Sequence, residues 1–255
     1  MTRATLLLAI IPCTALAQSG SREQALGKQL AVDVESRSTR VDDPAVVQYV
    51  SRIAQKLAQA AELQAPLTVR VITGDTAYAF PGASCYVNAG LILKAASEAE
   101  LAGAIAHLVA HMALWSSTPL EIGSEPQIPI YFAAACARLG GTFATRMVSV
   151  NGQRTLESQA DQAGLEYMAR AGYDPEGLAD FFERTLSSMP KKAFNPWAKF
   201  PASTRTQADS LCDRRSGFIV TTSEFHDVRQ RVASLIAKLT PPGAAPTLRP
   251  VKHLP

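Results

Sequence analysis

The sequence predicts an α+β fold that is mostly helical and contains one small antiparallel sheet. Hydrophobic residues make up 47% of the 255 residues and aromatic residues only 7%, so the core must consist largely of alanine and leucine, which favour helices. A β-branched alternating stretch near residue 70 predicts a strand, and several segments begin with helix caps followed by apolar residues at helical spacing. One domain over residues 18–239 is expected from this length and pattern.

Residues 1–17 have the features of an export signal. Arg3 supplies a positive charge, residues 4–11 are apolar, and Ala15-Leu16-Ala17 is a small-x-small cleavage site. The apolar part is too short to span a bilayer. Removing Arg3 with the signal leaves 24 Lys+Arg (25 minus 1) against 22 Asp+Glu, a net charge of +2, which gives no support for nucleic-acid binding. We therefore expect a periplasmic or secreted protein without a transmembrane span.

The first half of the domain combines helices with two strands. Residues 18–41 predict one leading helix, and Asp43 followed by Pro44 predicts the N-terminus of the next. Residues 67–73 and 84–88 predict strands, with a loop at 78–82 between them. The apolar residues expected to face inward from the second helix are Val46, Val47, Val50, Ile53 and Leu57.

A long alanine-rich helix is predicted to follow the second strand. Ser97 and Glu100 form a capping box at its start, and it is expected to end near Trp115. Residues 116–129 contain three prolines and predict a loop. Residues 130–148 are apolar but include arginines, so we expect a buried helical hairpin rather than a membrane span; contact with a membrane surface stays open.

The C-terminal part is expected to be helical. A helix is predicted from about Thr155 to Arg170 with Gly172 after it, and Asp174 caps the next one. Residues 195–204 predict a loop, and the proline-rich residues 240–255 predict a disordered tail. The final helix is expected at residues 222–239. The side chains expected to face the core from it are Phe225, Val228, Val232, Leu235 and Leu239.

Three cysteines remain after the predicted cleavage: Cys85, Cys136 and Cys212. An odd number cannot form a closed disulfide framework, and their spacing is not that of a C-x-x-C metal site. One disulfide with a free thiol and three buried thiols both stay open.

His107 and His111 are candidate metal ligands. They are four residues apart and therefore lie on one face of the predicted helix, where they can share one ion. On spacing alone, two packed or hydrogen-bonded histidines are an equally good interpretation.

Glu157 and Asp161 lie one turn apart on a later predicted helix and strengthen the metal hypothesis. Glu157 can complete a His2Glu zinc site that leaves a fourth position open, and Asp161 can hydrogen-bond a ligand histidine. The alternatives are an exposed acidic face and favourable charges near a helix N-terminus.

The run EAELAGAIAHLVAHM (residues 98–112) resembles the metal-binding helix of metallopeptidase family 48, which includes HtpX-like and BepA-like envelope proteases and CAAX prenyl proteases. The stretches DPAVVQYVSRIAQKL, AYAFPGASCYVNAGLI and ESQADQAGLEYMARAGYDP are similar to other parts of that family, so the resemblance covers roughly residues 25 to 210. It implies a zincin-like domain that holds one zinc ion through His107, His111 and Glu157, with Asp161 supporting a ligand. It also implies that an extended substrate aligns by β-addition along Ser84, Cys85, Tyr86, Val87 and Asn88.

The chain departs from the family pattern at two positions that carry chemistry. Leu108 stands where the family has the glutamate that acts as general base, and Phe200 corresponds to a histidine that assists the reaction. A positioned base contributes on the order of 10²–10⁴-fold to the rate. We therefore expect an exported zinc metallopeptidase homologue with impaired or absent proteolysis, which binds peptides or an unfolded envelope protein.

Two other interpretations stay open at this point. The chain could be an active zinc metalloendopeptidase with a substitute base, for which Glu121 and Glu125 are the nearest candidates in sequence, or a metal-free structural or peptide-binding envelope protein. His226 and His253 lie outside any acidic ligand pattern and are assigned no metal role. The sequence does not indicate an oligomeric state.

Overall fold

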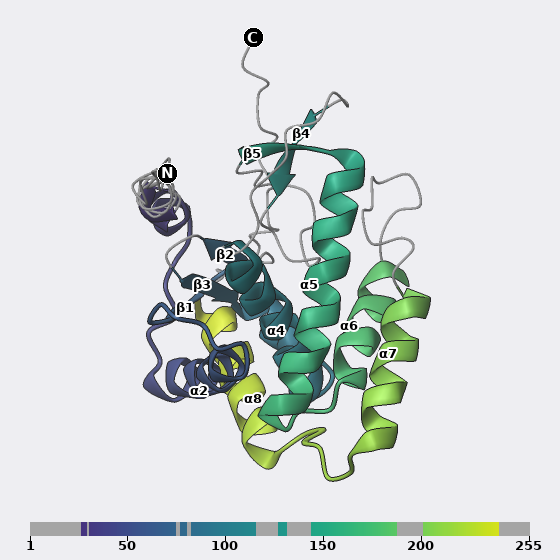
Figure 1. Cartoon of the computed structure of the whole chain (residues 1–255). Coiled ribbons are helices and arrows are strands. Elements are labelled where there is room, and N and C mark those ends of the chain that lie inside the picture. Colours follow the sequence, from purple (N-terminus) through teal and green to yellow (C-terminus); the bar gives the residue numbers. More distant parts are fainter. Residues whose placement is uncertain are drawn as a thin grey trace, which may run out of the picture.

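The computed structural model describes residues 27–29, 31–74, 77–80, 83–115, 127–131, 144–187 and 201–239. In this part of the chain, helices pack around a small sheet, and the predicted α+β class is confirmed (Figure 1). Helix α4 (Glu98–Trp115) is the central element, because it contacts α2 (Pro44–Ala60), α5 (Val150–Ala171), α6 (Glu176–Ser187) and the sheet.

The N-terminal helices are confirmed in part, because the leading helix predicted at 18–41 is helical at residues 27–29 and 31–37 but not at 38–41. Helix α2 spans Pro44–Ala60. The Asp43 carboxylate caps α2 by accepting hydrogen bonds from the backbone N–H groups of Ala45 and Val46. Of the apolar residues predicted to face inward, Val46, Val50, Ile53 and Leu57 are fully buried and Val47 packs at the edge of the core.

The three strands form a mixed sheet. Strands β1 (Thr68–Ile72), β2 (Tyr78–Phe80) and β3 (Ser84–Asn88) lie in the order β1-β3-β2. The predicted antiparallel sheet is wrong for the two predicted strands, because β1 and β3 are parallel. β3 is antiparallel only to β2, a strand that was not predicted: the chain first passes to the outer position as β2 and then returns to the middle as β3. The loop predicted at 78–82 is wrong for residues 78–80; the Pro81-Gly82 turn signal obscured a strand of only three residues.

A short helix not predicted from the sequence, α3 (Ala89–Lys94), follows β3, and the side-chain Oδ1 of Asn88 caps it by accepting the N–H of Leu91. The capping box before α4 is confirmed in part. Ser97 Oγ accepts the N–H of Glu100, but the Glu100 carboxylate accepts the N–H of Ala96 and pairs with Arg184 of α6. The glutamate thus joins two helices as well as capping one.

The helical hairpin predicted for residues 130–148 is wrong where the structure describes it. β4 (Gln127–Tyr131) and β5 (Ala144–Ser149) are antiparallel strands, so the predicted loop also ends before residue 127. A short apolar run fits a buried strand and a buried helix equally well, and periodicity cannot separate them.

The next two helices carry the predicted caps. α5 (Val150–Ala171) begins earlier than predicted and is followed by Gly172, whose φ of 82° suits a residue without a Cβ. α6 (Glu176–Ser187) begins where the Asp174 carboxylate accepts the N–H of Glu176.

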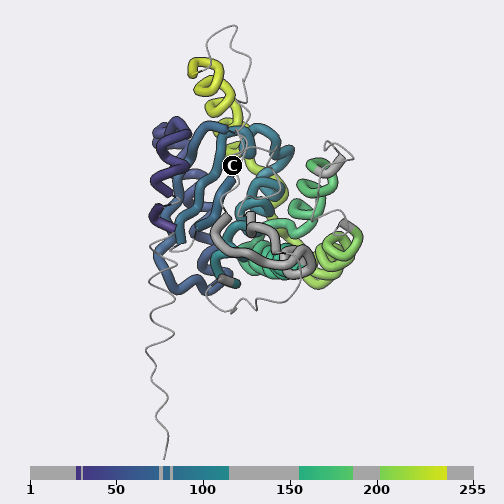
Figure 2. The backbone as a smooth tube through the Cα atoms, turned by 90° about the horizontal axis from the view of Figure 1, so that it is seen from above, coloured from purple at the N-terminus to yellow at the C-terminus, as the bar shows by residue number. Residues whose placement is uncertain are grey.

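The sequence predicted one of the last two helices but not the other. α7 (Pro201–Arg214) was not predicted, and residues 201–204 belong to it rather than to a loop. α8 (Ser223–Leu239) was predicted, and Phe225, Val228 and Val232 are buried on it as expected. Leu239 is 51% exposed, so its inward placement is wrong: the last turns of α8 project beyond the body of the domain (Figure 2).

Several predictions fall outside the described residues: the signal at 1–17, the tail at 240–255, Cys136, Phe200, and the candidate bases Glu121 and Glu125. Of the cysteines within the description, Cys85 is buried, Cys212 is partly exposed, and both are free thiols. None of the helices in the described ranges is long and apolar enough to cross a membrane.

Glycines allow α4 to approach its neighbours at backbone distance. A Cβ added to Gly103 of α4 would lie 2.7 Å from the Cα of Leu178 on α6, and one added to Gly177 would lie 2.5 Å from the carbonyl carbon of Ala99. A Cβ added to Gly164 of α5 would lie 3.4 Å from the backbone N of His107. These contacts set the spacing between α4 and the two helices that pack on it.

We expect Gly103→Ala to lower the free energy of unfolding by about 1–3 kcal/mol, the usual cost of overpacking a tight interior. The matched control is Gly164→Ala, where the added methyl has more room and the change should stay within about 1 kcal/mol, because alanine also improves helix propensity by that amount. Urea denaturation of the two variants measures the difference. Equal stability of Gly103→Ala and the unmodified protein would contradict the close α4–α6 contact.

Candidate metal centre

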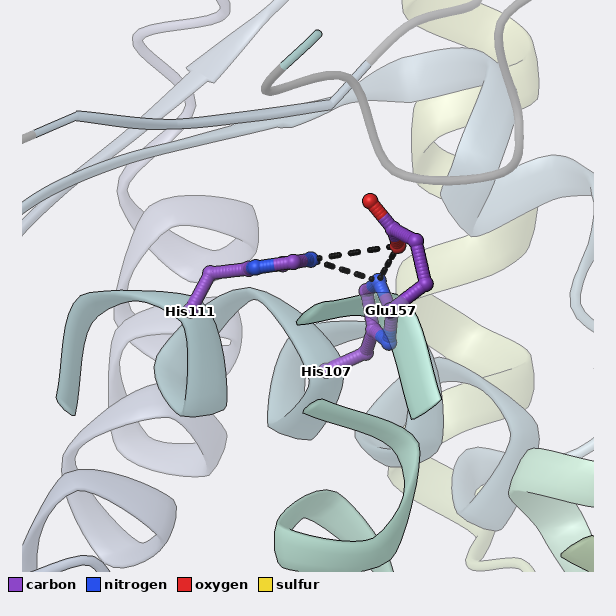
Figure 3. A group of neighbouring side chains, drawn as sticks. All are labelled: His107, His111 and Glu157. Carbon is purple, nitrogen blue, oxygen red and sulfur yellow. Dashed lines mark hydrogen bonds and ion pairs between the residues drawn. The ribbon is translucent and has the colours of Figure 1, made fainter. Parts of the chain in front are cut away.

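Four side chains from two helices meet in the interior. His107 and His111 project from α4, and Glu157 and Asp161 project from α5. Each pair is separated by four residues, so each helix presents its pair on one face. Figure 3 shows the two imidazoles and the Glu157 carboxylate pointing toward one another.

Three potential ligand atoms form a nearly equilateral triangle. His107 Nε2 lies 3.0 Å from His111 Nε2 and 3.2 Å from Glu157 Oε2, and His111 Nε2 lies 3.3 Å from the same oxygen. Tetrahedral zinc with bonds of about 2.1 Å places its ligand atoms ~3.4 Å apart. The triangle is therefore within a few tenths of an ångström of the arrangement that a His2Glu zinc site requires, and the donor set fits that ion.

Asp161 fixes the orientation of His107. Its Oδ1 lies 2.8 Å from His107 Nδ1, so this nitrogen donates its proton to the carboxylate and Nε2 is left to face His111 and Glu157. In the neutral imidazole, this hydrogen-bond partner selects the tautomer in which Nε2 carries no proton and can act as a metal ligand.

The cluster is buried, which excludes an exposed acidic face. His107, Glu157 and Asp161 are each only 1% exposed, while the side chain of His111 retains 13% exposure. α5 begins at Val150, so Glu157 lies two turns inside the helix and does not serve as an N-terminal charge. Solvent reaches the cluster on the His111 side.

The electrostatics of the cluster favour a positive charge between the ligands. Burial acts to raise the pKa of Glu157, but both imidazoles outweigh it and hold that pKa well below its usual range. Burial acts to lower the pKa of His107, but its hydrogen bonds to Asp161 and Glu157 raise it to about 10. Burial raises the pKa of Asp161, with His107 opposing the shift. The carboxylates thus stabilise a cation at this point.

Leu108 brings no titratable group to the site. It is 1% exposed and belongs to the main hydrophobic cluster of the domain. The carboxylates that the described residues place against the histidines are Glu157 and Asp161, and both are engaged with imidazole nitrogens.

The substrate-binding edge predicted at Ser84–Asn88 is corrected by the sheet order. β3 is the middle strand: β1 pairs with it along its whole length, and β2 pairs with Ser84, Cys85 and Tyr86 on the other side. A peptide therefore cannot add alongside β3 where both neighbours are in place. Val87 and Asn88 are likewise buried in the domain.

Sequence reasoning missed Phe182 of α6 as a neighbour of the site. Its ring centroid lies 5.5 Å from that of His107, at an interplanar angle of 83°. The Phe181-Phe182 pair one turn after the start of α6 was visible, but only the packing of α6 on α4 brings it to the histidine.

Asp174, Glu176 and Cys212 form a second group of neighbouring candidate ligand atoms. Capping accounts for its geometry, because the Asp174 carboxylate accepts both the N–H of Glu176 and the Cys212 thiol.

A sequence model of peptidase family M48 matches residues 44–196, more than half of the chain and inclusive of all four clustered side chains. The beta-barrel assembly-enhancing protease of Escherichia coli K12 is 26% identical over 183 residues, which cover 65% of this chain and 38% of that protein. A Vibrio cholerae protein provisionally given the same name is 30% identical over 162 residues, covering 56% and 34% respectively.

A mitochondrial relative matches as well. The metalloendopeptidase OMA1 of Schizosaccharomyces pombe is 26% identical over 144 residues, covering 53% of this chain and 43% of its own length. The matched region thus spans about a third to two fifths of each of these relatives. On the family match over residues 44–196, the chain belongs to peptidase family M48.

Proposed function

We propose that this protein is an exported, zinc-binding M48 metallopeptidase homologue in which proteolysis is impaired because leucine replaces the general base. The observation that carries the proposal is the ligand triangle of His107, His111 and Glu157, set beside the buried Leu108. In this proposal all three metal ligands are in place, but the residue that would accept the proton at position 108 is absent.

The three ligands would hold one zinc ion and leave a fourth position for water or a substrate group. When bound, zinc supplies a Lewis acid that polarises a carbonyl and lowers the pKa of coordinated water. Glu157 contributes the negative charge that compensates the ion, and Asp161 keeps His107 Nε2 directed at the shared point. Both roles are independent of Leu108.

The neighbouring carboxylates are poor substitutes for the missing base. Glu157 Oε2 faces both histidines, and Asp161 Oδ1 accepts the proton of His107 Nδ1. The other oxygen of Asp161 is buried, so it has no route to a substrate. Moving either group onto a substrate would dismantle the ligand set.

The binding partner in this proposal is a peptide segment or an unfolded protein of the cell envelope. The named relatives include proteases described as enhancing β-barrel assembly, and the site opens to solvent at His111. A protein that binds such segments without cleaving them rapidly would retain substrate binding but not peptide-bond hydrolysis.

The second candidate is an active zinc metalloendopeptidase. Family membership and the complete ligand set favour it, and Glu121 or Glu125, which follow α4 in the sequence, would then have to supply the base. A metal-free structural or peptide-binding protein is the third candidate, in which the contacts within the triangle are hydrogen bonds and ion pairs only.

Export through residues 1–17 is part of the proposal. We expect the mature protein to begin at Gln18, after the Ala15-Leu16-Ala17 cleavage site. N-terminal sequencing of the protein recovered from the periplasm or the culture medium checks this. An intact N-terminus on protein that stays in the cytoplasm would rule export out.

Restoring the carboxylate should restore turnover. We expect Leu108→Glu to raise chelator-sensitive cleavage of casein by about 10²–10⁴-fold, the contribution of a positioned base. The matched control is Leu108→Gln, which has nearly the same shape but cannot take up a proton, and it should show no gain. Zinc content and circular dichroism of each variant establish that the altered helix still folds, since a misdirected buried carboxylate would be costly.

Two results of this assay would change the account. Chelator-sensitive activity of the unmodified protein equal to that of Leu108→Glu would favour the active-protease candidate. A folded, zinc-loaded Leu108→Glu without activity would show that the base is not the only missing part, and Leu108→Glu combined with Phe200→His would then test the second departure.

A further inference from the structure

We infer that Phe182 of α6 is a positioning residue that holds the His107 imidazole in its metal-binding orientation. The two ring centroids are 5.5 Å apart and the ring planes are nearly perpendicular, at 83°. Both side chains are almost fully buried, His107 with 1% and Phe182 with 3% exposure. The inference rests on the proposed function, because it concerns a ligand of the proposed zinc ion.

The contact is the third in a regular seam between α4 and α6. Ala99, Gly103 and His107 lie four residues apart on one face of α4. Ala99 meets Gly177 and Gly103 meets Leu178 at backbone distance. Phe182 lies one turn beyond Leu178, as His107 lies one turn beyond Gly103, so the first two contacts fix the register of the third.

Phe182 restrains a motion that the hydrogen bond to Asp161 leaves available. Asp161 holds Nδ1 and Glu157 lies 3.2 Å from Nε2, so the imidazole can still rotate about the line that joins these two contacts. The ring of His111, on the same helix, packs against the His107 ring with the two centroids 4.6 Å apart and the ring planes at 86°. The ring of Phe182 packs against the His107 ring from α6. Together the three contacts direct Nε2 at Glu157.

The adjacent Phe181 provides a matched control. It is equally buried, at 2% exposure, and lies on the same helix within the hydrophobic core. Its ring contacts Phe182 at a centroid distance of 6.1 Å. The ring contacts recorded for His107 in the described residues are those with His111 and Phe182. Replacing either phenylalanine removes similar core packing, but only Phe182 borders the ligand.

The experiment compares Phe182→Leu with Phe181→Leu, and includes Phe182→Tyr as the variant that keeps the ring. In the metal-free protein, imidazole ¹⁵N NMR should show a weakened His107–Asp161 hydrogen bond for Phe182→Leu only. Zinc affinity, measured by competition with a chelator, should fall about tenfold in Phe182→Leu, at the low end of the range for changes around metal ligands. The absorption bands of cobalt-substituted protein should shift in the same variant.

Equal effects of Phe182→Leu and Phe181→Leu on zinc affinity and on the His107 signals would overturn the inference, since both would then act through general packing. Failure of Phe182→Tyr to retain the unmodified affinity would also count against a role of the ring. If Phe182→Leu does not fold, Phe182→Met takes its place in all three measurements. Absence of zinc binding in the unmodified protein would refute the proposed function, while the metal-free NMR comparison would still decide the positioning role.

Discussion

The packing of α4 between α5 and α6 is the constraint on which the site depends. Gly103 and Gly177 let α4 and α6 meet at backbone distance, which a larger side chain would prevent, and Gly164 of α5 lies against the α4 backbone with 3.4 Å of room for a Cβ. The packing of α5 on α4 places two histidines from one helix against two carboxylates from the other. A wider separation of α4 and α5 would open the triangle of ligand atoms, so the packing of the core also sets the geometry of the site.

The buried charges explain why the two histidines and the two carboxylates stabilise one another independently of Leu108. Two carboxylates that are each about 1% exposed are costly unless a positive charge compensates them. His107 and His111 supply part of that compensation, and a divalent cation would supply the rest. In the proposed function, a bound metal would link α4 to α5, a role that would need His107, His111 and Glu157 but not a carboxylate at position 108.

Local signals predicted most helices and the candidate ligands, whereas contacts between distant segments were out of reach. Asp43, Ser97 and Asp174 marked helix starts correctly because capping depends on neighbours a few residues away. The same holds for the two ligand pairs, whose common face follows from helical spacing alone. The parallel pairing of β1 with β3, and the strands at 127–131 and 144–149, depend on partners far along the chain. So does the contact of Phe182 with His107.

X-ray absorption at the zinc edge of protein purified without added metal tests the central claim most directly. The account predicts one zinc per chain, surrounded by nitrogen and oxygen at about 2.0–2.1 Å with the scattering pattern of two imidazoles. The signal should disappear in His107→Ala and persist in the control His226→Ala, which alters an exposed histidine on α8. Absence of zinc, or sulfur at about 2.3 Å from it, would contradict the ligand set of His107, His111 and Glu157.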